Sequence, residues 1–460
     1  MKPTDTYKGV KALEIYKVPN FESITDELII ALIDRYKTQE TNRMTRLMDY
    51  YIAKSDVKSR AMTDSSKPNN KIANPFASYI VDTVQGYFLG KPVAYQSDNE
   101  DLMVRIQTVY DRNHEQAHNS KMGKQLSITG IAYELMYMNE QNEVKFAMID
   151  PREVFMIYDN SIEQKSLMAV RFYDVHDYVT DEEVTHIELY SNNMIQYCTI
   201  GEDALVVTDE SPHYFKEVPV IVYKNNDEMT GDFEKVIDQI NAYDLAVSDT
   251  ANNLEYFADS YLVLTNMEGT EPSDIAEMKE NRVMLLGENG KAQWLVKSQE
   301  NMEVESYKDR LRNDLHSLSH VPNMNDESFA NAQSGESLKY KLFGLENMVS
   351  IKESLFKKAL ESRVRLITNI MNVQGGQHSY TDIQMKFSRN LPSNAVAWAD
   401  VASKLAGLVS QETLLSILPF VDNPAEELIR INTEKQGTMY ESFFDKDSMP
   451  TDTDVEDDLQ

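Results

Sequence analysis

Apolar residues in the first ninety positions recur mainly at helical spacing. A first helix, which Ser23 or Thr25 can cap, is predicted by the series Leu28, Ile29, Leu32, Ile33 and Tyr36. A second is predicted by the series Met44, Leu47, Met48 and Tyr51. A polar loop follows at 55–70, and a third helix runs to Gly90, where Pro92 stops it. Another helix is expected over 99–119.

The pattern changes from helical to strand-like at Gly130. Turn-forming Asp, Asn, Gly and Pro residues separate short strand-like runs at 130–138, 143–149, 154–158, 168–173, 185–189, 194–199 and 218–223. We therefore predict a mixed, mostly antiparallel β region over 130–225 that packs on a helical base.

The second half of the chain combines long helical patterns with a small β excursion. A helix is predicted over 230–260, and its polar side carries Asp232, Glu234, Asp238, Asp244, Asp249, Glu255 and Asp259. Three short β runs follow, at 261–265, 282–286 and 292–296, and a helix over 304–320 comes next. A loop at 322–333 precedes a very long helix that Ser334 can cap and that ends at Gly375-Gly376.

At about 1.5 Å per residue, the first of these helices is about 45 Å long and the last is nearer 60 Å. Long helices with charge on most sides are commonly packed side by side in assemblies. The C-terminal part is predicted to form helices over 393–409, 411–418 and 425–436, with an acidic disordered tail over 441–460. The whole pattern indicates an α+β protein.

Composition sets outer limits on the class of protein. A chain of 460 residues is expected to form roughly two to four compact regions. The best apolar run, at 28–33, is far shorter than a membrane span, and the N-terminus lacks the apolar stretch of a secretory signal. Cys198 is the only cysteine, so no intrachain disulfide is possible and a reducing compartment is expected.

The formal net charge of −30 bears on nucleic-acid binding. Proteins that grip DNA tightly neutralise phosphates with Lys and Arg, so this charge argues against a sequence-specific DNA binder. It does not argue against a conduit, because a negative wall repels phosphate and lets DNA slide. A plain acidic surface on a soluble protein is the alternative interpretation.

The motifs of common enzymes and metalloproteins do not fit. The stretch from Gly86 to Lys91 has too few residues between its glycines for a phosphate loop, and Pro92 replaces the required hydroxyl. Gly287 to Lys291 fits a hairpin turn better. His114 and His118 lie four apart, which we interpret as a solvated helix face. We therefore expect no catalytic residue, no metal site and no cofactor.

Four segments, taken in order, resemble the portal proteins of tailed bacteriophages, particularly the branch found in long-tailed phages of Gram-positive hosts. The first runs from Asn69 through Ile80-Val81-Asp82 to Val93, and the second joins Gly130-Ile131-Ala132-Tyr133-Glu134 to Asp150-Pro151. The third joins Val321-Pro322-Asn323-Met324 to Ser334-Gly335-Glu336-Ser337-Leu338-Lys339, and the fourth joins Leu408 to Thr413 with Glu426-Glu427. The likeness spans about 25–435.

The resemblance implies a non-enzymatic subunit of a homo-oligomeric ring, commonly of twelve copies, around a channel at one capsid vertex of the virion. Double-stranded DNA would pass through without sequence specificity. The implied partners are the terminase large subunit, a head-tail adaptor, and capsid and scaffolding proteins, with no membrane; assembly would occur in the host cytoplasm. The implied regions are a wing (1–229), a stem helix (230–260), a clip (261–302), a second stem helix (303–321), a tunnel loop (322–333), a long wing helix with a return strand (334–389) and a crown (390–440).

Candidate site residues follow from this division of the chain. Lys308 and Arg312 lie four apart on the second stem helix, which suits a cationic ring; pairing within the helix to Glu305 and Asp309 is equally compatible with the sequence. The loop offers Asn323, Asn325, Asn331 and Gln333 for weak contacts with DNA, or is a plain surface loop. Partner contacts in the clip are expected from Glu268, Glu271, Asn289 and Lys291.

Two other functions remain open from the sequence. One is a phage packaging enzyme, a nuclease or ATPase, which requires a metal or nucleotide site. The other is an acidic adaptor that forms no channel.

Overall fold

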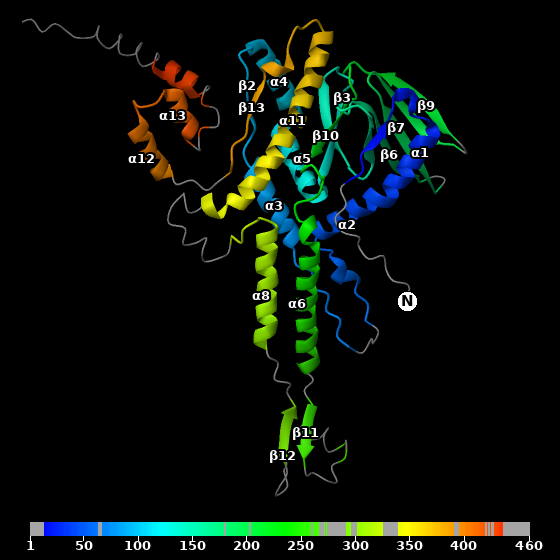
Figure 1. Ribbon diagram of the computed structural model, residues 1–460, viewed down its shortest axis with the longest axis vertical. Coiled ribbons are helices and arrows are strands. Elements are labelled where there is room, and N and C mark those ends of the chain that lie inside the picture. The colour runs from blue at the N-terminus through cyan, green and yellow to red at the C-terminus, as the bar shows by residue number, and fades with distance from the viewer. Residues whose placement is uncertain are drawn as a thin grey trace, which may run out of the picture.

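The structure is a computed structural model, and the residues it describes are 13–62, 67–178, 181–201, 204–258, 261–265, 271, 273, 291–295, 301–324, 339–390, 395–418, 421, 424 and 427–435. A broad body of helices and sheets carries a thin two-helix projection with a β hairpin at its far end (Figure 1). The fold is α+β, as the sequence pattern predicted.

The N-terminal helices follow the predicted apolar series. Strand β1 (Tyr16–Val18) precedes α1 (Asp26–Tyr36), and the hydroxyl of Thr25 accepts the backbone N–H of Leu28 at 3.3 Å, so Thr25 is the N-cap. One wide helical turn (Lys37–Thr41) then leads into α2 (Asn42–Tyr51). The three-residue strand β1 is too short to leave a periodic signal, and it was not predicted.

Two sheets make up the β region. The larger has the order β1-β5-β6-β7-β8-β9, in which β1 is parallel to β5 and the other pairs are antiparallel. Its further strands are β5 (Val154–Asp159), β6 (Ser166–Asp177), β7 (Glu182–Tyr190), β8 (Met194–Ile200) and β9 (Leu205–Pro212). The smaller has the antiparallel order β10-β3-β4, with β10 (Val220–Lys224), β3 (Ile131–Met138) and β4 (Val144–Ile149). The predicted mixed, mostly antiparallel region is confirmed, apart from the exposed edge strand β9, which the sequence pattern missed.

The helical base contains α3 (Phe76–Leu89), α4 (Glu100–Asn113) and α5 (Glu115–Thr129). A single helix over 99–119 was expected, and this prediction is wrong at its centre. His114 has a left-handed φ of 51° that ends α4 and starts α5 in a new direction. Strands β2 (Ala94–Gln96) and β13 (Gln384–Lys386) pair antiparallel, so the expected return strand is present.

The projection consists of α6 (Ile237–Ala258) and α8 (Asn301–Leu318), which we call the rod. A 3-10 turn (Glu234–Val236) precedes α6, so this helix begins later than predicted. Strands β11 (Tyr261–Thr265) and β12 (Lys291–Leu295) pair antiparallel as the tip hairpin. The third expected strand, at 282–286, lies outside the described residues. The predicted order of helix, β excursion and helix is confirmed.

The longest described helix, α11 (Phe343–Val373), crosses the body beside α3 and β10 (Figure 1). It ends just before Gly375, whose φ of 101° suits glycine, as predicted; Ser334 lies outside the described residues. Thirteen of its residues are buried, so it is a core helix and not one with charge on most sides. Beyond it lie α12 (Ala395–Leu405), α13 (Gln411–Ile417) and helical residues 427–435; the expected disordered tail, 441–460, is not described.

Candidate functional site: the rod and its anchors

The rod exposes apolar side chains on both of its helices. Leu254 of α6 is 61 % exposed and Met302 of α8 is 85 % exposed, and Tyr307 is also exposed. Within residues 302–318, Leu315 alone is buried. Two helices side by side cannot cover each other on more than one face. A single chain therefore leaves much of the rod without the packing partners that its apolar residues need.

The two candidate cations of the rod are paired within α8. Lys308 Nζ lies 2.5 Å from Glu305 Oε1, and Arg312 Nη2 lies 2.9 Å from Asp309 Oδ1. In the single chain, the intrahelical pairing that the sequence allowed is therefore present. Arg312 and Asp309 are 44 % and 58 % exposed, so this pair contributes about 0–1 kcal/mol. That is weak enough for an approaching phosphate to compete for Arg312, whereas the Lys308 side chain is only 14 % exposed.

The segment after α8 is fixed to the body by the side chain of Tyr79. Its hydroxyl donates to the carbonyl of Pro322 at 2.9 Å and accepts the backbone N–H of Met324 at 3.0 Å. His316 adds a contact of 3.0 Å between Nδ1 and the carbonyl of Val321. Burial lowers the pKa of His316, which favours its neutral form. Of the candidate loop residues, Asn323 lies in this fixed segment; Asn325, Asn331 and Gln333 lie outside the described residues.

At the tip hairpin, Lys291 is the first residue of β12 and pairs in register with Thr265. Glu271 is exposed. Glu268 and Asn289 lie outside the described residues. The structure thus places one of the four candidate contact residues in the hairpin itself.

One flank of α6 is covered by residues 55–62 and 67–74, which we call the strap. Asp244 accepts from the hydroxyl of Ser55 at 2.5 Å and from the backbone N–H of Asn74 at 2.9 Å. One turn further on, the Ser248 hydroxyl accepts the backbone N–H of Ile72 at 3.0 Å. Arg60 Nη1 lies 2.6 Å from Asp249 Oδ1. The contacts recur along α6 at three- to five-residue spacing, so the strap follows the helix axis.

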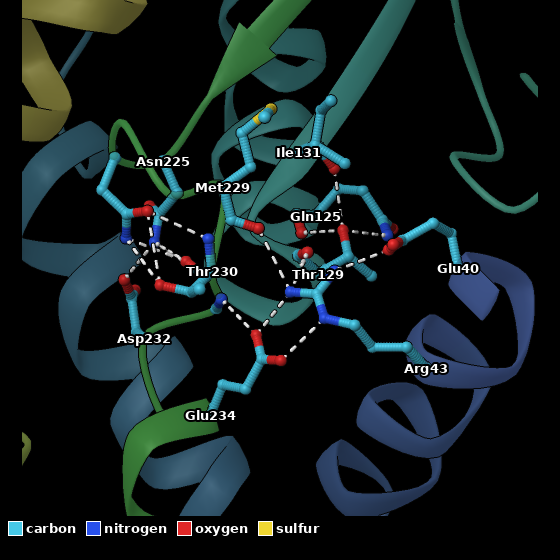
Figure 2. A network of polar contacts seen from close by, with 12 residues as sticks. Glu40, Arg43, Gln125, Thr129, Ile131, Asn225, Met229, Thr230, Asp232 and Glu234 are labelled. Carbon is cyan, nitrogen blue, oxygen red and sulfur yellow. Dashed lines mark hydrogen bonds and ion pairs between the residues drawn. The ribbon is translucent and has the colours of Figure 1, made fainter. Parts of the chain in front are cut away.

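Figure 2 shows the point where the rod joins the body, which we call the rod root. Arg43 of α2 donates through Nε and Nη2 to the two carboxylate oxygens of Glu234 at 2.7 and 2.5 Å, and Nη2 also lies 3.1 Å from the carbonyl of Met229. The same carboxylate accepts the backbone N–H of Gly231 at 3.0 Å. Planar two-point pairing of this kind fixes direction as well as distance. It sets the angle at which α6 leaves the body.

A second buried ion pair fixes the rod root to α11. Lys352 Nζ lies 2.7 Å from Asp232 Oδ2 and donates to the Ser127 hydroxyl at 2.8 Å, and both charged side chains are 1 % exposed. Burial lowers the pKa of Lys352, while Asp232 acts in the opposite direction. Gly231 directly precedes Asp232, and a Cβ added there would stand 2.3 Å from the carbonyl oxygen of Ile128. The backbone therefore approaches too closely there for any other residue.

These contacts correct one expectation from the sequence. Asp232, Glu234 and Asp244 were assigned to the solvated acidic side of a long helix. Their side chains are instead buried and hold the rod to the body and the strap. Buried carboxylates need such partners, because an unpaired buried charge is very costly.

The body beneath the rod contains a fully buried arginine, Arg363 of α11. It donates through Nη2 and Nε to Glu134 of β3 at 2.7 and 3.0 Å, and through Nη1 to Asn119 at 2.9 Å. Tyr223 of β10 donates to the same carboxylate at 2.9 Å. Burial alone would raise the pKa of Glu134, but Arg363 and His118 lower it to about 2. The cluster ties α5, β3, β10 and α11 together.

The interpretation of His114 and His118 as one solvated face is wrong for His118. Its Nε2 lies 2.7 Å from Glu134 Oε1, and its ring packs edge-on against Phe146. His114 is exposed at the break between α4 and α5. The change of direction at His114 removes the common helix face on which the interpretation rested.

The described part of the chain lacks the features of a metal site and of a membrane span. Within that part, no group of three or more His, Cys, Asp or Glu residues could hold a metal ion. No helix in the same ranges is long and apolar enough to cross a membrane.

Comparison with known proteins gives one family across most of the chain. The model of the family "Phage portal protein, SPP1 Gp6-like" matches residues 30–440. The portal protein of Bacillus phage SPP1 is 24 % identical over 441 residues, covering 88 % of this chain and 86 % of that protein. The portal protein of Clostridium phage phiCD119 is 23 % identical over 429 residues, covering 86 % and 94 %.

Among solved structures, a chain in the neck of an empty gene transfer agent particle has a TM-score of 0.43 and 14 % identity, and the match covers 82 % of this chain and 93 % of that one. A chain in the native gene transfer agent virion gives the same TM-score and identity, covering 82 % and 92 %. The family match alone extends over far more than half of the sequence, from α1 to the last helical residues. The chain therefore belongs to the SPP1 Gp6-like family of phage portal proteins.

Proposed function

We propose that the chain is one subunit of a closed ring, of about twelve copies, that walls a channel for double-stranded DNA at a capsid vertex of the phage. The observation that carries the proposal is the family match over 30–440. The exposed apolar residues of the rod support it, because copies placed side by side would cover Leu254, Met302 and Tyr307.

In this proposal, each region expected from the sequence corresponds to one part of the structure. The rod is the stem, the tip hairpin is the clip, the body is the wing, and α12 with the residues after it is the crown. The rod root fixes the stem angle, so that identical copies repeat the same tilt around the ring. The ring is assembled in the host cytoplasm and stays in the virion.

DNA passes through the channel without a fixed register. Lys308 and Arg312 alternate between ion pairs with their intrahelical acids and ion pairs with passing phosphates. The loop contributes weak contacts with DNA from the side-chain amides of Asn323, Asn325, Asn331 and Gln333. Because few free cations of the channel wall contact the DNA, few counterions are released from its phosphates, and no position of the DNA is strongly favoured. The tip residues Glu268, Glu271, Asn289 and Lys291 contact the terminase large subunit during packaging and the head-tail adaptor afterwards. Capsid and scaffolding proteins contact the wing.

The channel assignment is tested by reversing single charges on α8. Lys308→Glu and Arg312→Glu are expected to form rings with wild-type yield but to lower the number of DNA-filled heads when phage is produced from the variant gene. The matched control is Arg310→Glu on the same helix, where the side chain is 82 % exposed. If all three variants package DNA equally well, Lys308 and Arg312 do not line the channel.

The purified chain is proposed to have no enzymatic activity of its own. Incubation with magnesium and plasmid DNA, or with ATP, is expected to give no cleavage and no phosphate release above a buffer blank. Magnesium-dependent turnover by the purified chain would instead favour a packaging enzyme. Electron micrographs of particles without a central hole would favour an adaptor.

A further inference from the structure

A cleft of about 660 Å³ opens in the body between α11, β10 and the β1–β5 edge of the larger sheet. Its lining contains no residue of α6 or α8, and it reaches the rod root only at Met229. Its apolar lining includes Ile15, Tyr158, Val222 and Leu355, which are only half-buried. The cleft therefore offers a strip of incompletely covered apolar surface to a ligand.

The charges around the cleft leave a positive excess. Lys216, Lys224 and Lys358 line it, and none of the three has a carboxylate within ion-pairing distance in the described part of the chain. The remaining charged groups are mostly satisfied: Glu14 lies 2.6 Å from Arg35, Glu163 lies 3.2 Å from Lys165, and Glu217 lies 3.0 Å from Arg365. The exposed Asp227 is the remaining acid of the lining.

Lys224 is the most buried of the three lysines. Burial lowers its pKa, the neighbouring Lys358 lowers it further, and Asp227 acts in the opposite direction. Lys224 is half-buried and Lys358 is exposed. Their two ammonium groups repel, and an anion between them relieves that repulsion. The lining carries five Lys and Arg side chains and four carboxylates, so the cleft has a small positive excess in a chain of net charge −30.

The sequence itself contains a segment with the complementary chemistry. Residues 436–460 lie outside the described part of the chain and contain eight acidic residues and one lysine, Lys446. Near their start, three aromatic residues lie close to acids: Tyr440 precedes Glu441, and Phe443 and Phe444 lie between Glu441 and Asp445. Aromatic side chains suit the apolar strip, and the carboxylates suit the lysine rim.

We propose that the acidic, aromatic C-terminal segment 439–447 docks in this cleft, with Tyr440, Phe443 and Phe444 on the apolar strip and its carboxylates on Lys224 and Lys358. From Lys435, the last described residue, the twelve residues to Asp447 span at most about 40 Å when extended. The cleft that receives the segment belongs to the same copy or to an adjacent one. Docking within one copy does not depend on the proposed ring, whereas docking into an adjacent copy rests on it.

Carbodiimide cross-linking of the full chain tests this contact directly, because the reagent joins a lysine only to a carboxylate in contact with that lysine. Peptide mass spectrometry is expected to find Lys224 or Lys358 joined to Glu441, Asp445 or Asp447, with yields that fall in 1 M salt. A mixture of light and heavy-isotope chains shows whether the link lies within a copy or between copies, and either result supports the docking. Links from these lysines only to acids elsewhere would overturn it.

Hydrogen exchange supplies a second, independent readout. Amides of 440–447 are expected to exchange several-fold more slowly in the wild-type chain than in the double variant Lys224→Glu, Lys358→Glu. The matched control, Lys54→Glu with Lys121→Glu, reverses two exposed lysines that do not line the cleft and should exchange like wild type. Equal exchange in all three proteins would overturn the proposal.

Substitutions in the cleft could also unfold the body, so a variant in the segment itself provides a test that leaves the body unchanged. Phe443→Ser with Phe444→Ser leaves the cleft unchanged and is expected to increase acetylation of Lys224 and Lys358 by an amine-reactive reagent. Unchanged acetylation of both lysines would contradict the docking, as would equal hydrogen exchange in the three proteins above.

Discussion

At the scale of single residues, buried ion pairs hold the rod to the body. Arg43 and Glu234 are 191 positions apart, and Lys352 and Asp232 are 120 positions apart. Sequence spacing within one helix carries no information about partners so distant. For that reason the sequence pattern assigned Asp232 and Glu234 to a solvated face. Their burial became evident only when the segments were seen together.

Removing Arg363 should be among the most damaging single changes in the body. Arg363→Ala leaves Glu134 buried without its main partner, which is expected to cost about 3–5 kcal/mol of unfolding free energy. The control is Arg365→Ala two residues away, where the pair with Glu217 is 35 % and 43 % exposed and is worth about 0–1 kcal/mol. Denaturant midpoints of the two variants measure the difference. Equal midpoints would show that the buried cluster contributes little to stability.

Glu134 also predicts a pH dependence. Its pKa in the folded chain is about 2, below the usual value of 4.5, so its ionised form stabilises the fold above about pH 4.5. This contribution is lost as the pH falls from 4.5 toward 2. Thermal midpoints of wild type and Glu134→Gln should therefore differ most at pH 6 and converge below pH 4.5. The exposed Glu22→Gln variant should follow wild type throughout; a gap that stays constant with pH contradicts the assignment.

Gly231 at the rod root should tolerate no side chain. In Gly231→Ala the added Cβ meets the carbonyl oxygen of Ile128 at 2.3 Å, and relieving this contact is expected to cost about 1–3 kcal/mol. Gly86, in the last turn of α3, has no atom within 4 Å of the same position outside its own helix backbone. Gly86→Ala should therefore stabilise the chain by about 0.5–1 kcal/mol. Thermal midpoints that shift in the same direction for both variants would contradict the close approach at the root.

At the scale of elements, the sequence pattern predicted most helices and strands correctly, because apolar periodicity reports burial directly. It failed where periodicity is weak. Strand β1 has three residues, and β9 is exposed over most of its length. The break at His114 depends on one left-handed residue that no apolar spacing marks. The expectation that α11 has charge on most sides was wrong, because charged residues such as Lys352 and Arg363 are buried in ion pairs.

The strap is an element that the sequence showed only as a polar loop. Its hold on α6 centres on the buried Asp244, so Asp244→Ala should release it and increase cleavage within 55–74 by a protease added at low concentration. The control is Asp238→Ala, one and a half turns earlier on α6 and exposed. Cleavage rates followed by gel or mass spectrometry measure the effect. If both variants resist cleavage like wild type, the hydrogen bonds of Asp244 do not hold the strap in place.

At the scale of the whole molecule, family and fold class followed from the order of segments, whereas the site residues stay a prediction. Lys308 and Arg312 lie on α8 and pair with acids of the same helix, and in the proposed ring their further neighbours would belong to other copies. Asn325, Asn331 and Gln333 lie outside the described residues. The thin rod, with Leu315 as the one buried residue among 302–318, is the strongest structural indication that copies pack together.

The proposed ring makes a definite statement about purified protein. Copies whose rods pack side by side should enclose an opening, and the exposed Leu254, Met302 and Tyr307 should lie at contacts between them. Electron microscopy of purified particles viewed end-on tests this claim most directly. The account predicts closed rings with a central hole and with the rods projecting from one side. Single globular particles at every salt concentration, with rods that contact no neighbouring copy, would contradict it.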